Sequence, residues 1–543
     1  MKKIKIFITI TLGSIFFSCT DLEPEIFSEI TPENFFQSDE QLASFAAAAY
    51  TPLFSYWGNH EVSELNTDVA TVPVRSNGGW NDGGFWPRLM THQFNPLDFV
   101  GDRWNTWFGG VGTCNRLLET LEESLDAADP SIAELKLLRA FYFYQALDLF
   151  GNIPLETRFA DANPQPSQSS SAEAFDFIEK ELLEAIPNAT ESTAAYAKMN
   201  KWIGYMVLAK LYLNAERFGA GPHYQEAADA ANAIINSSTY SLESGYFANF
   251  LIENEGSTEN MFVVPYDRTN AGGFLIRWQA LHQSANPTFG ISGGGTPWGG
   301  FSIQEDFYNA FDENDKRRGM FIIGQQYTVQ GQPSFSTDEG FFYANPKEEF
   351  KLIDCAEDFD NYSDASDKES FGWNSKTSDQ LSDAERKDFC NINITPGYQF
   401  SADGRALYRN GARYGKFEYP IGIGAGASND FPIYRFADVL LIRAEALWRM
   451  NNGSAEALAL VNEIRDRAGV ERLSTLTEDG LYWEIKKELA LENHSRATTI
   501  RFGHWQDEWF LKAANPSETH KEFFPIPQGQ LDANPNLTQN PGY

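Results

Sequence analysis

The stretch KWIGYMVLAKLYLNAERFGAGPHYQEAADAANAIIN, residues 201–236, decides the fold. The spacing of Tyr205, Leu208 and Tyr212 places these side chains on one face of a helix over about 201–216. Glycine and proline at 219–222 predict a turn, and an alanine-rich helix follows at 224–236. A helix, a turn and a helix of small residues form the tetratricopeptide unit, which buries its apolar face by stacking on neighbouring units.

The same arrangement extends along the chain in both directions. Ser38 and Gln41 have the form of a helix-capping box and open an alanine-rich helix that reaches Tyr50. Further helices are expected at about 102–123, around 137–147, and at 172–186, 435–450 and 455–467. We therefore predict an all-α fold of about four tetratricopeptide-like helix pairs.

Between about residues 240 and 430 the helical periodicity fails. Glycine, proline, asparagine, serine and aromatic residues dominate this segment. Long ordered loops of this kind usually carry function. We expect a large loop-rich, ligand-binding insertion at 240–430, between helical repeats at 38–239, which include an aromatic loop at about 66–100, and a last repeat with the C-terminal segment at 431–543.

The N-terminus has the composition of an export signal. Three lysines at positions 2, 3 and 5 precede an apolar run at 6–17 and then Ser18 and Cys19. This pattern predicts a signal peptide at 1–18, because the run is shorter than the ~20 residues that cross a bilayer. Cys19 would then be the lipidated first residue of a tether at 19–37, and several acyl chains make such an anchor stable. Phe16 and Phe17 depart from the usual lipidation motif, so a secreted protein with an incidental cysteine is the alternative.

The composition restricts the possible ligands and reactions. The chain has 543 residues and a formal net charge of −33, which argues against nucleic acid as a partner, because nucleic-acid binding rests on cationic contacts to phosphates. The same charge disfavours polyanionic glycans, although a local basic pocket could override it. Neither a His-Glu-x-x-His zinc helix nor a phosphate-binding Gly-x-x-x-x-Gly-Lys loop occurs. We expect no enzymatic activity and no cofactor.

Two loops contain tryptophans together with polar side chains. Residues 77–88 read NGGWNDGGFWPR and contain two tryptophans among glycines. A second loop runs from Arg277 to Asn286 and continues through 296–300. Sugar rings need a flat aromatic surface for their C–H face and polar groups for their hydroxyl rim. The expected ligand-binding residues are Trp80, Trp86, Trp298, Trp278, Asn81, Asp82 and Arg88; the alternative for each tryptophan is core packing, which the helical spacing favours for Trp104 and Trp107.

The cysteines and one acidic segment leave two further possibilities. Cys114 lies in an apolar helical pattern, as a buried thiol would. Cys355 and Cys390 flank an acidic segment and could form a disulfide in an oxidising compartment, although sequence alone does not establish the geometry. Within that segment Asp358, Asp360, Asp364 and Asp367 are weak candidates for calcium ligands, and a solvated acidic loop is the alternative.

The C-terminal residues 523–543, FFPIPQGQLDANPNLTQNPGY, contain four prolines, and we expect no helix there. This segment resembles the C-terminal signature of the SusD/RagB family. Blocks at 138–155, 202–213, 434–446 and 461–469 resemble the same family and occur in its order. The resemblance also covers a charged helix with Glu488, Glu492, Arg496 and Arg501, but Asn493 stands where the family usually has glycine, and the sequence at 497–499 lacks one charged partner.

The resemblance implies a surface-exposed outer-membrane lipoprotein. Such a protein would capture an oligosaccharide or polysaccharide, here a neutral glycan, and deliver it to a SusC-like TonB-dependent transporter. A peptide-capturing, RagB-like lipoprotein of the same transporter system and a glycoside hydrolase are the alternatives. The conspicuous charges Arg139, Arg435, Asp438, Arg443 and Glu445 lie in apolar helical patterns, and we interpret them as paired structural charges rather than catalytic groups.

Overall fold

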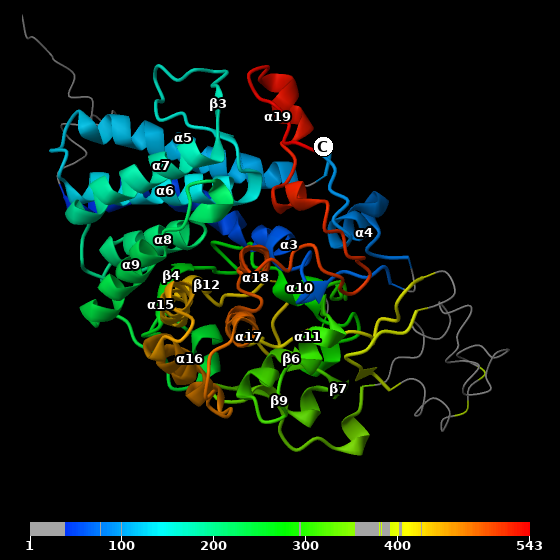
Figure 1. Ribbon diagram of the computed structural model, residues 1–543. Helices are drawn as coiled ribbons and strands as arrows, with labels where there is room; N and C mark the ends of the chain where they lie inside the picture. Colours follow the sequence, from blue (N-terminus) through cyan, green and yellow to red (C-terminus); the bar gives the residue numbers. More distant parts are fainter. Residues whose placement is uncertain are drawn as a thin grey trace, which may run out of the picture.

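The computed structural model describes residues 38–75, 78–98, 100–292, 295–352, 380, 382, 391–400, 404–424 and 426–543. Its main helices pack as successive antiparallel pairs that form one side of the molecule (Figure 1). The pairs are α2 (Asp39–Tyr50) with α5 (Val100–Glu122), α6 (Pro130–Phe150) with α7 (Ser171–Ala185), α8 (Lys201–Leu213) with α9 (Tyr224–Ser237), and α15 (Phe436–Met450) with α16 (Ala455–Ala468). This arrangement confirms the predicted all-α fold of tetratricopeptide-like helix pairs.

Local sequence signals explain where these helices begin and end. The Asn200 side chain accepts hydrogen bonds from the backbone N–H groups of Trp202 and Ile203 and so caps α8. Gly219, at φ +80°, reverses the chain after the turn that follows α8. Buried alanines such as Ala227 and Ala231 let α9 pack closely between α8 and α15.

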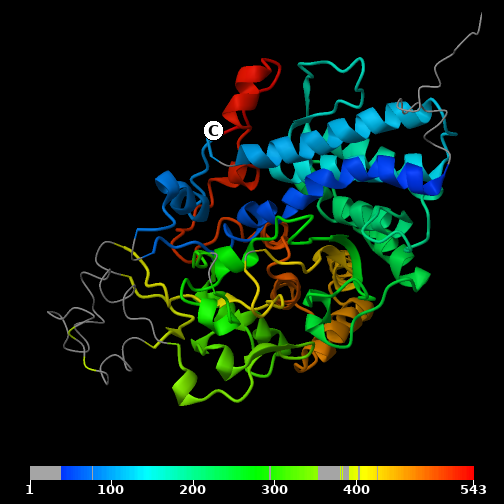
Figure 2. The same cartoon turned by 180° about the vertical axis from the view of Figure 1, so that it is seen from behind.

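The described residues between 240 and 430 form short elements on the other side of the molecule (Figure 2). The longest pairing is antiparallel, between β4 (Asn260–Val264) and β12 (Phe431–Arg435), and it joins the beginning of this segment to the beginning of α15. The other strands are β1 (Ala70–Thr71), β2 (Ile153–Pro154), β3 (Gln168–Ser169), β5 (Ser302–Ile303), β6 (Phe321–Ile322), β7 (Gly324–Gln325), β8 (Pro333–Ser336), β9 (Gly340–Tyr343), β10 (Asn393–Ile394) and β11 (Arg413–Tyr414). They pair as β1–β5, β2–β3, β6–β11, β7–β10 and β8–β9.

The described chain has further α-helices outside the four pairs. They are α3 (Asn59–Ser63), α4 (Phe85–Met90), α10 (Ile276–Ala280), α11 (Glu305–Asn309), α17 (Glu478–Leu489), α18 (Ser495–Arg501) and α19 (Gln528–Ala533). No helix in the described ranges is both long and apolar enough to cross a membrane.

A buried ion network fastens residues 240–430 to the last repeat. Arg435 is fully buried and binds three carboxylates, at 2.5 Å from Glu259, 2.8 Å from Glu488 and 2.6 Å from Glu492. The other cations of the network are Arg317, Lys416, Arg465 and Arg467, and its other acids are Asp315 and Glu484. Five cations therefore balance five carboxylates (Arg317, Lys416, Arg435, Arg465 and Arg467 against Glu259, Asp315, Glu484, Glu488 and Glu492).

The other charges that the sequence suggested as structural are also paired. Arg139 binds Glu181, Asp438 binds Lys210, and Arg443 binds Glu456. The Glu445 carboxylate binds two arginines, Arg449 at 2.8 Å and Arg501 at 2.7 Å. Arg501 is therefore paired through α15, although residues 497–499 supply no charged partner.

The C-terminal segment is ordered and docks on the first repeats. The Asn540 side chain donates to the carbonyls of Phe150, at the end of α6, and of Phe524. The expectation that this segment contains no helix is wrong, since α19 occupies residues 528–533. Pro527 stands at the N-cap position, where its missing N–H removes no helical hydrogen bond, and α19 ends before Pro535.

Several predictions from the sequence concern single residues. Trp104, Trp107 and Cys114 are all buried on α5, as the helical spacing predicted. Cys19, the pair Cys355 and Cys390, and the four aspartates Asp358, Asp360, Asp364 and Asp367 lie outside the described residues, so their lipidation, disulfide and calcium assignments stay predictions.

Candidate ligand-binding platform

The structure brings together the tryptophans of the two aromatic loops, although the loops lie far apart in the sequence. The indole N–H of Trp80 donates to the backbone carbonyl of Trp298 at 2.9 Å, and the two rings are 6.1 Å apart between centroids. Trp278 stacks on Trp298 at 6.4 Å, and Trp86 meets Trp80 edge-on at 5.4 Å. We call these four residues the tryptophan cluster.

The four rings differ in their exposure to solvent. Trp298 is 49% exposed, Trp80 is half-buried, and Trp86 and Trp278 are buried. Trp86 and Trp278 therefore support the cluster from the protein interior, and Trp298 and Trp80 form its accessible surface. An exposed tryptophan held by other aromatic rings is a common feature of interaction sites.

Backbone conformation fixes the position of Trp80. Trp80 itself has φ +62°, a left-handed conformation that costs a non-glycine residue energy and is concentrated at functional sites. The ring lies directly on the backbone of Gly300, where an added Cβ would come within 2.2 Å of the indole. Gly300 is therefore required for the packing of Trp80 on this backbone. In the sequence, the one signal for this role is that Gly300 stands two residues after Trp298.

Strand pairing and a buried arginine hold the two loops side by side. β1 pairs with β5, which places Ala70 opposite Ile303, close to both tryptophan loops. Arg75 is fully buried and donates to the carbonyls of Leu407 and Gly300 at 2.9 and 3.1 Å. Arg75 also donates to the Ser302 hydroxyl at 3.2 Å. Sequence reasoning missed Arg75, because its acceptors are mostly backbone carbonyls of distant residues, which carry no sequence signature.

Arg277 stabilises the second loop in a similar way. Its guanidinium donates to the carbonyls of Ile423 and Gly424 and, at 3.2 Å, to the side-chain oxygen of Asn286. The Asn286 amide in turn donates to the carbonyl of Gly295 at 2.7 Å. Burial lowers the pKa of Arg277 to about 10, so the side chain stays charged at neutral pH.

The polar residues expected at the first loop take different positions. Asn81 and Asp82 are exposed beside Trp80, and the Asp82 carboxylate accepts the indole N–H of Trp86. Arg88 forms an ion pair with Asp98, whose hydrogen bonds raise the pKa of Arg88, and it also donates to the carbonyl of Gly83. Asn81 and Asp82 are therefore available at the surface, whereas Arg88 stabilises the loop.

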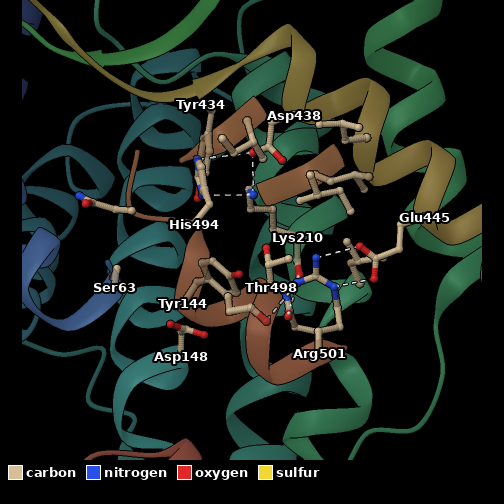
Figure 3. Close-up of a pocket in the computed structure, with 18 of the residues that line it drawn as sticks. Ser63, Tyr144, Asp148, Lys210, Tyr434, Asp438, Glu445, His494, Thr498 and Arg501 are labelled. Atoms are coloured by element: carbon tan, nitrogen blue, oxygen red, sulfur yellow. Dashed lines mark hydrogen bonds and ion pairs between the residues drawn. The ribbon is translucent and has the colours of Figure 1, made fainter. Parts of the chain in front are cut away.

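A second feature is a small internal cavity (Figure 3), and none of the four tryptophans of the cluster lines it. Its volume is about 50 Å³, well below the roughly 300–1,000 Å³ of ligand pockets. It is therefore too small for a sugar. In the described part of the chain no group of three or more His, Cys, Asp or Glu side chains is placed to hold a metal ion.

One catalytic motif matches in sequence but not in structural context. Residues 290–294 read Gly-Ile-Ser-Gly-Gly, which fits the Gly-x-Ser-x-Gly pattern of serine hydrolases. That motif acts when the serine stands on a sharp turn between a strand and a helix. Here Ser292 lies in coil after a 3₁₀ turn at Asn286–Phe289, and residues 293 and 294 lie outside the described ranges.

Two family models match most of the chain. Residues 293–543 match the model described as SusD family, and residues 21–213 match the model described as starch-binding associating with outer membrane. The starch-binding protein SusD of Bacteroides thetaiotaomicron is 25% identical over 429 residues, which cover 76% of this chain and 72% of that protein.

Solved structures share the fold. A SusD superfamily protein from Parabacteroides distasonis has a TM-score of 0.69 and 20% identity, covering 95% of this chain and 100% of that chain. Surface glycan-binding protein A from Bacteroides thetaiotaomicron, solved in complex with laminarihexaose, has a TM-score of 0.66 and 20% identity, covering 92% of this chain and 99% of that chain.

Proposed function

This chain is a SusD-like member of the SusD/RagB family that associates with the outer membrane, and from that premise we propose that it binds a glycan at the cell surface through the tryptophan cluster. One relative is named as a starch-binding protein, and a structural neighbour was solved with a bound glucan oligosaccharide. Binding without catalysis is the activity that we assign.

The exposed ring of Trp298 is the observation that carries the proposal. Its backbone carbonyl is held by the Trp80 indole, its backbone N–H donates to the carbonyl of Trp278 at 2.5 Å, and its ring stacks on Trp278. The ring is therefore presented to solvent in a fixed orientation, which keeps the entropy cost of binding low. A sugar would stack its C–H face on Trp298 and Trp80, and Asn81 and Asp82 would bind its hydroxyl groups.

Charge supports a neutral glycan over a polyuronate. The net charge of −33 disfavours the approach of a polyanion. Near the cluster, the guanidinium groups of Arg88 and Arg277 already donate to protein oxygens. Neither is available for the bidentate contact by which arginine recognises a carboxylate.

The partner we propose is a SusC-like TonB-dependent transporter, to which the protein delivers its glycan. Lipidation of Cys19 would anchor the chain ahead of α2. The described chain begins at Ser38, the N-cap of α2. The dark-blue helix α2 lies on the side of the helical layer away from α4 (Figure 2). The tether would therefore leave the molecule far from the tryptophan cluster, and the cluster would stay accessible.

Affinity electrophoresis of the mature protein against β-glucans, α-glucans, mannans, xylans and polyuronates tests the proposal. We expect one neutral glycan to retard the protein. Trp298→Ala should weaken binding about two- to tenfold, since an aromatic contact contributes roughly 0.5–1.5 kcal/mol beyond the area that it buries. Phe159→Ala is the matched control, because Phe159 is an equally exposed aromatic, at 50%, on the loop between α6 and α7.

Four outcomes would contradict the proposal or one of its parts. Equal retardation of the wild type and Trp298→Ala would place glycan binding elsewhere on the molecule. No retardation by any glycan would favour a peptide ligand, and preferred binding to alginate or pectin would exclude the neutral-glycan assignment. Release of reducing ends during incubation would identify a hydrolase instead of a binding protein.

A further inference from the structure

The small internal cavity lies where α6, α8 and α15 meet the segment that contains α18 (Figure 3). Its wall is polar. Lys210 of α8 and Asp438 of α15 form an ion pair at 2.6 Å, and Arg501 of α18 binds Glu445 of α15. The cavity therefore lies at the junction between the α8–α9 pair, the α15–α16 pair and α18.

Oδ2 of Asp438, on the wall of this cavity, makes no hydrogen bond within the described ranges but is paired with the Lys210 ammonium. Three further buried polar atoms on this cavity have no hydrogen-bond partner among the described residues. They are the hydroxyl of Tyr434, the amide nitrogen of Asn493 and the Nε2 atom of His494. A buried polar group without a partner costs roughly 1–3 kcal/mol, and such groups are rare in native proteins. Three of them on the wall of one cavity indicate a common ligand.

The distances around His494 also indicate that Nε2 needs a further partner. Nε2 of His494 lies 3.7 Å from Asp438, which is too long for a direct hydrogen bond. Burial, together with the cations Lys210, Arg435, Lys416 and Arg501, lowers the pKa of His494 well below its usual value, so the ring is neutral. Nδ1 of His494 faces the Lys210 ammonium at 3.5 Å and is the acceptor, which leaves the proton on Nε2.

Asn493 is positioned for this role by its backbone. It has φ +70°, in a tight turn between α17 and α18 that needs a left-handed residue. Its side-chain oxygen is 3.1 Å from Nδ1 of the buried His60, which fixes the amide. The amide nitrogen is then on the wall of the cavity. Glycine would satisfy the turn but would supply neither contact.

We propose that the cavity is a binding site for a cluster of ordered water molecules held by Tyr434, Asn493, His494 and Asp438. A water molecule needs roughly 10–15 Å³ of cavity volume and two to four polar partners. A volume of about 50 Å³ therefore accommodates about three to five water molecules. The donors on Tyr434, Asn493 and His494 and the Asp438 carboxylate supply partners of both kinds. Water molecules there would bridge α15 to the segment 493–501.

The test combines a crystal structure with one substitution. The wild-type protein should show solvent peaks within hydrogen-bond distance of the Tyr434 hydroxyl, Asn493 Nδ2 and His494 Nε2. Tyr434→Phe removes the hydroxyl but keeps the ring, so at least one peak should disappear. Because the remaining water loses a partner, the unfolding constant should rise by roughly tenfold.

Tyr142→Phe is the matched control. The Tyr142 hydroxyl is equally buried, but it donates directly to the carbonyl of Ala49 at 2.6 Å. Its loss calibrates the effect of removing one satisfied buried hydroxyl. In a dry cavity Tyr434→Phe would remove an unsatisfied group, and the unfolding constant would stay the same or fall. Either that result or a cavity without solvent peaks overturns the proposal.

Discussion

Removal of the Arg435 guanidinium should destabilise the whole protein. Arg435→Met keeps most of the side-chain volume but leaves the buried network with one excess negative charge. Glu492 would keep Lys416 as its partner, and Glu488 and Glu259 would keep Arg467. Loss of one partner from a buried ion pair costs about 3–5 kcal/mol, because the remaining charges cannot regain water.

The expected change in melting temperature follows from the size of the chain. Unfolding entropy is about 2.1 cal/mol/K per residue, or roughly 1 kcal/mol/K for about 500 residues. A loss of about 3–5 kcal/mol should therefore lower Tm by about 3–5 °C, measured by calorimetry at neutral pH. Circular dichroism before heating checks that the variant has folded.

Arg472→Met is the control for this experiment. Arg472 binds Asp466 on the surface, where both side chains are largely exposed, and exposed ion pairs contribute little to stability. Its Tm should equal that of the wild type. If Arg435→Met melts at the same temperature as Arg472→Met, the reasoning from buried, balanced charges is refuted.

Three further predictions concern pH, the platform and the C-terminal segment. Burial alone would raise the pKa of Glu488, but three arginines lower this pKa to about 2. The contribution of Glu488 to stability is therefore complete above the unfolded pKa of about 4.5 and is lost as the pH falls towards 2. A Tm that does not decrease below pH 4.5 would contradict this prediction. Gly300→Ala should displace Trp80 and abolish glycan retardation at unchanged helicity, whereas Gly109→Ala, where a Cβ meets open space, should bind like the wild type. Asn540→Ala removes two hydrogen bonds that hold the C-terminal segment, so limited proteolysis should cleave that segment faster than in the wild type, and equal cleavage rates would show that other contacts hold it.

The helical scaffold could be predicted from the sequence because its signals are local. The caps at Ser38 and Asn200 and the glycine at 219 mark helix ends within a few residues of the atoms that they bind. α19 was missed because proline was treated as excluding any helix, although Pro527 stands just outside it. Which proline positions are harmless depends on where the helix begins, and no local periodicity marks a helix of this length.

The tryptophan cluster was predictable only in its residue types. Sequence identified the two loops, but burial of Trp86 and exposure of Trp298 depend on how segments about 220 residues apart meet. The anchoring by Arg75 and the balanced charges around Arg435 depend in the same way on distant partners. A single sequence carries no record of those distances, so the geometry of the site came from the structure.

The docking of residues 524–540 on the first repeats has a consequence for biogenesis. Thr538 and Asn540 bind groups that precede them by 370 and 390 positions. The predicted signal peptide would export the chain N-terminus first, so α6 would reach the periplasm long before this segment. The surface of the first repeats that residues 524–540 cover would therefore remain exposed until translocation is nearly finished. A product truncated by twenty residues would lack these contacts altogether.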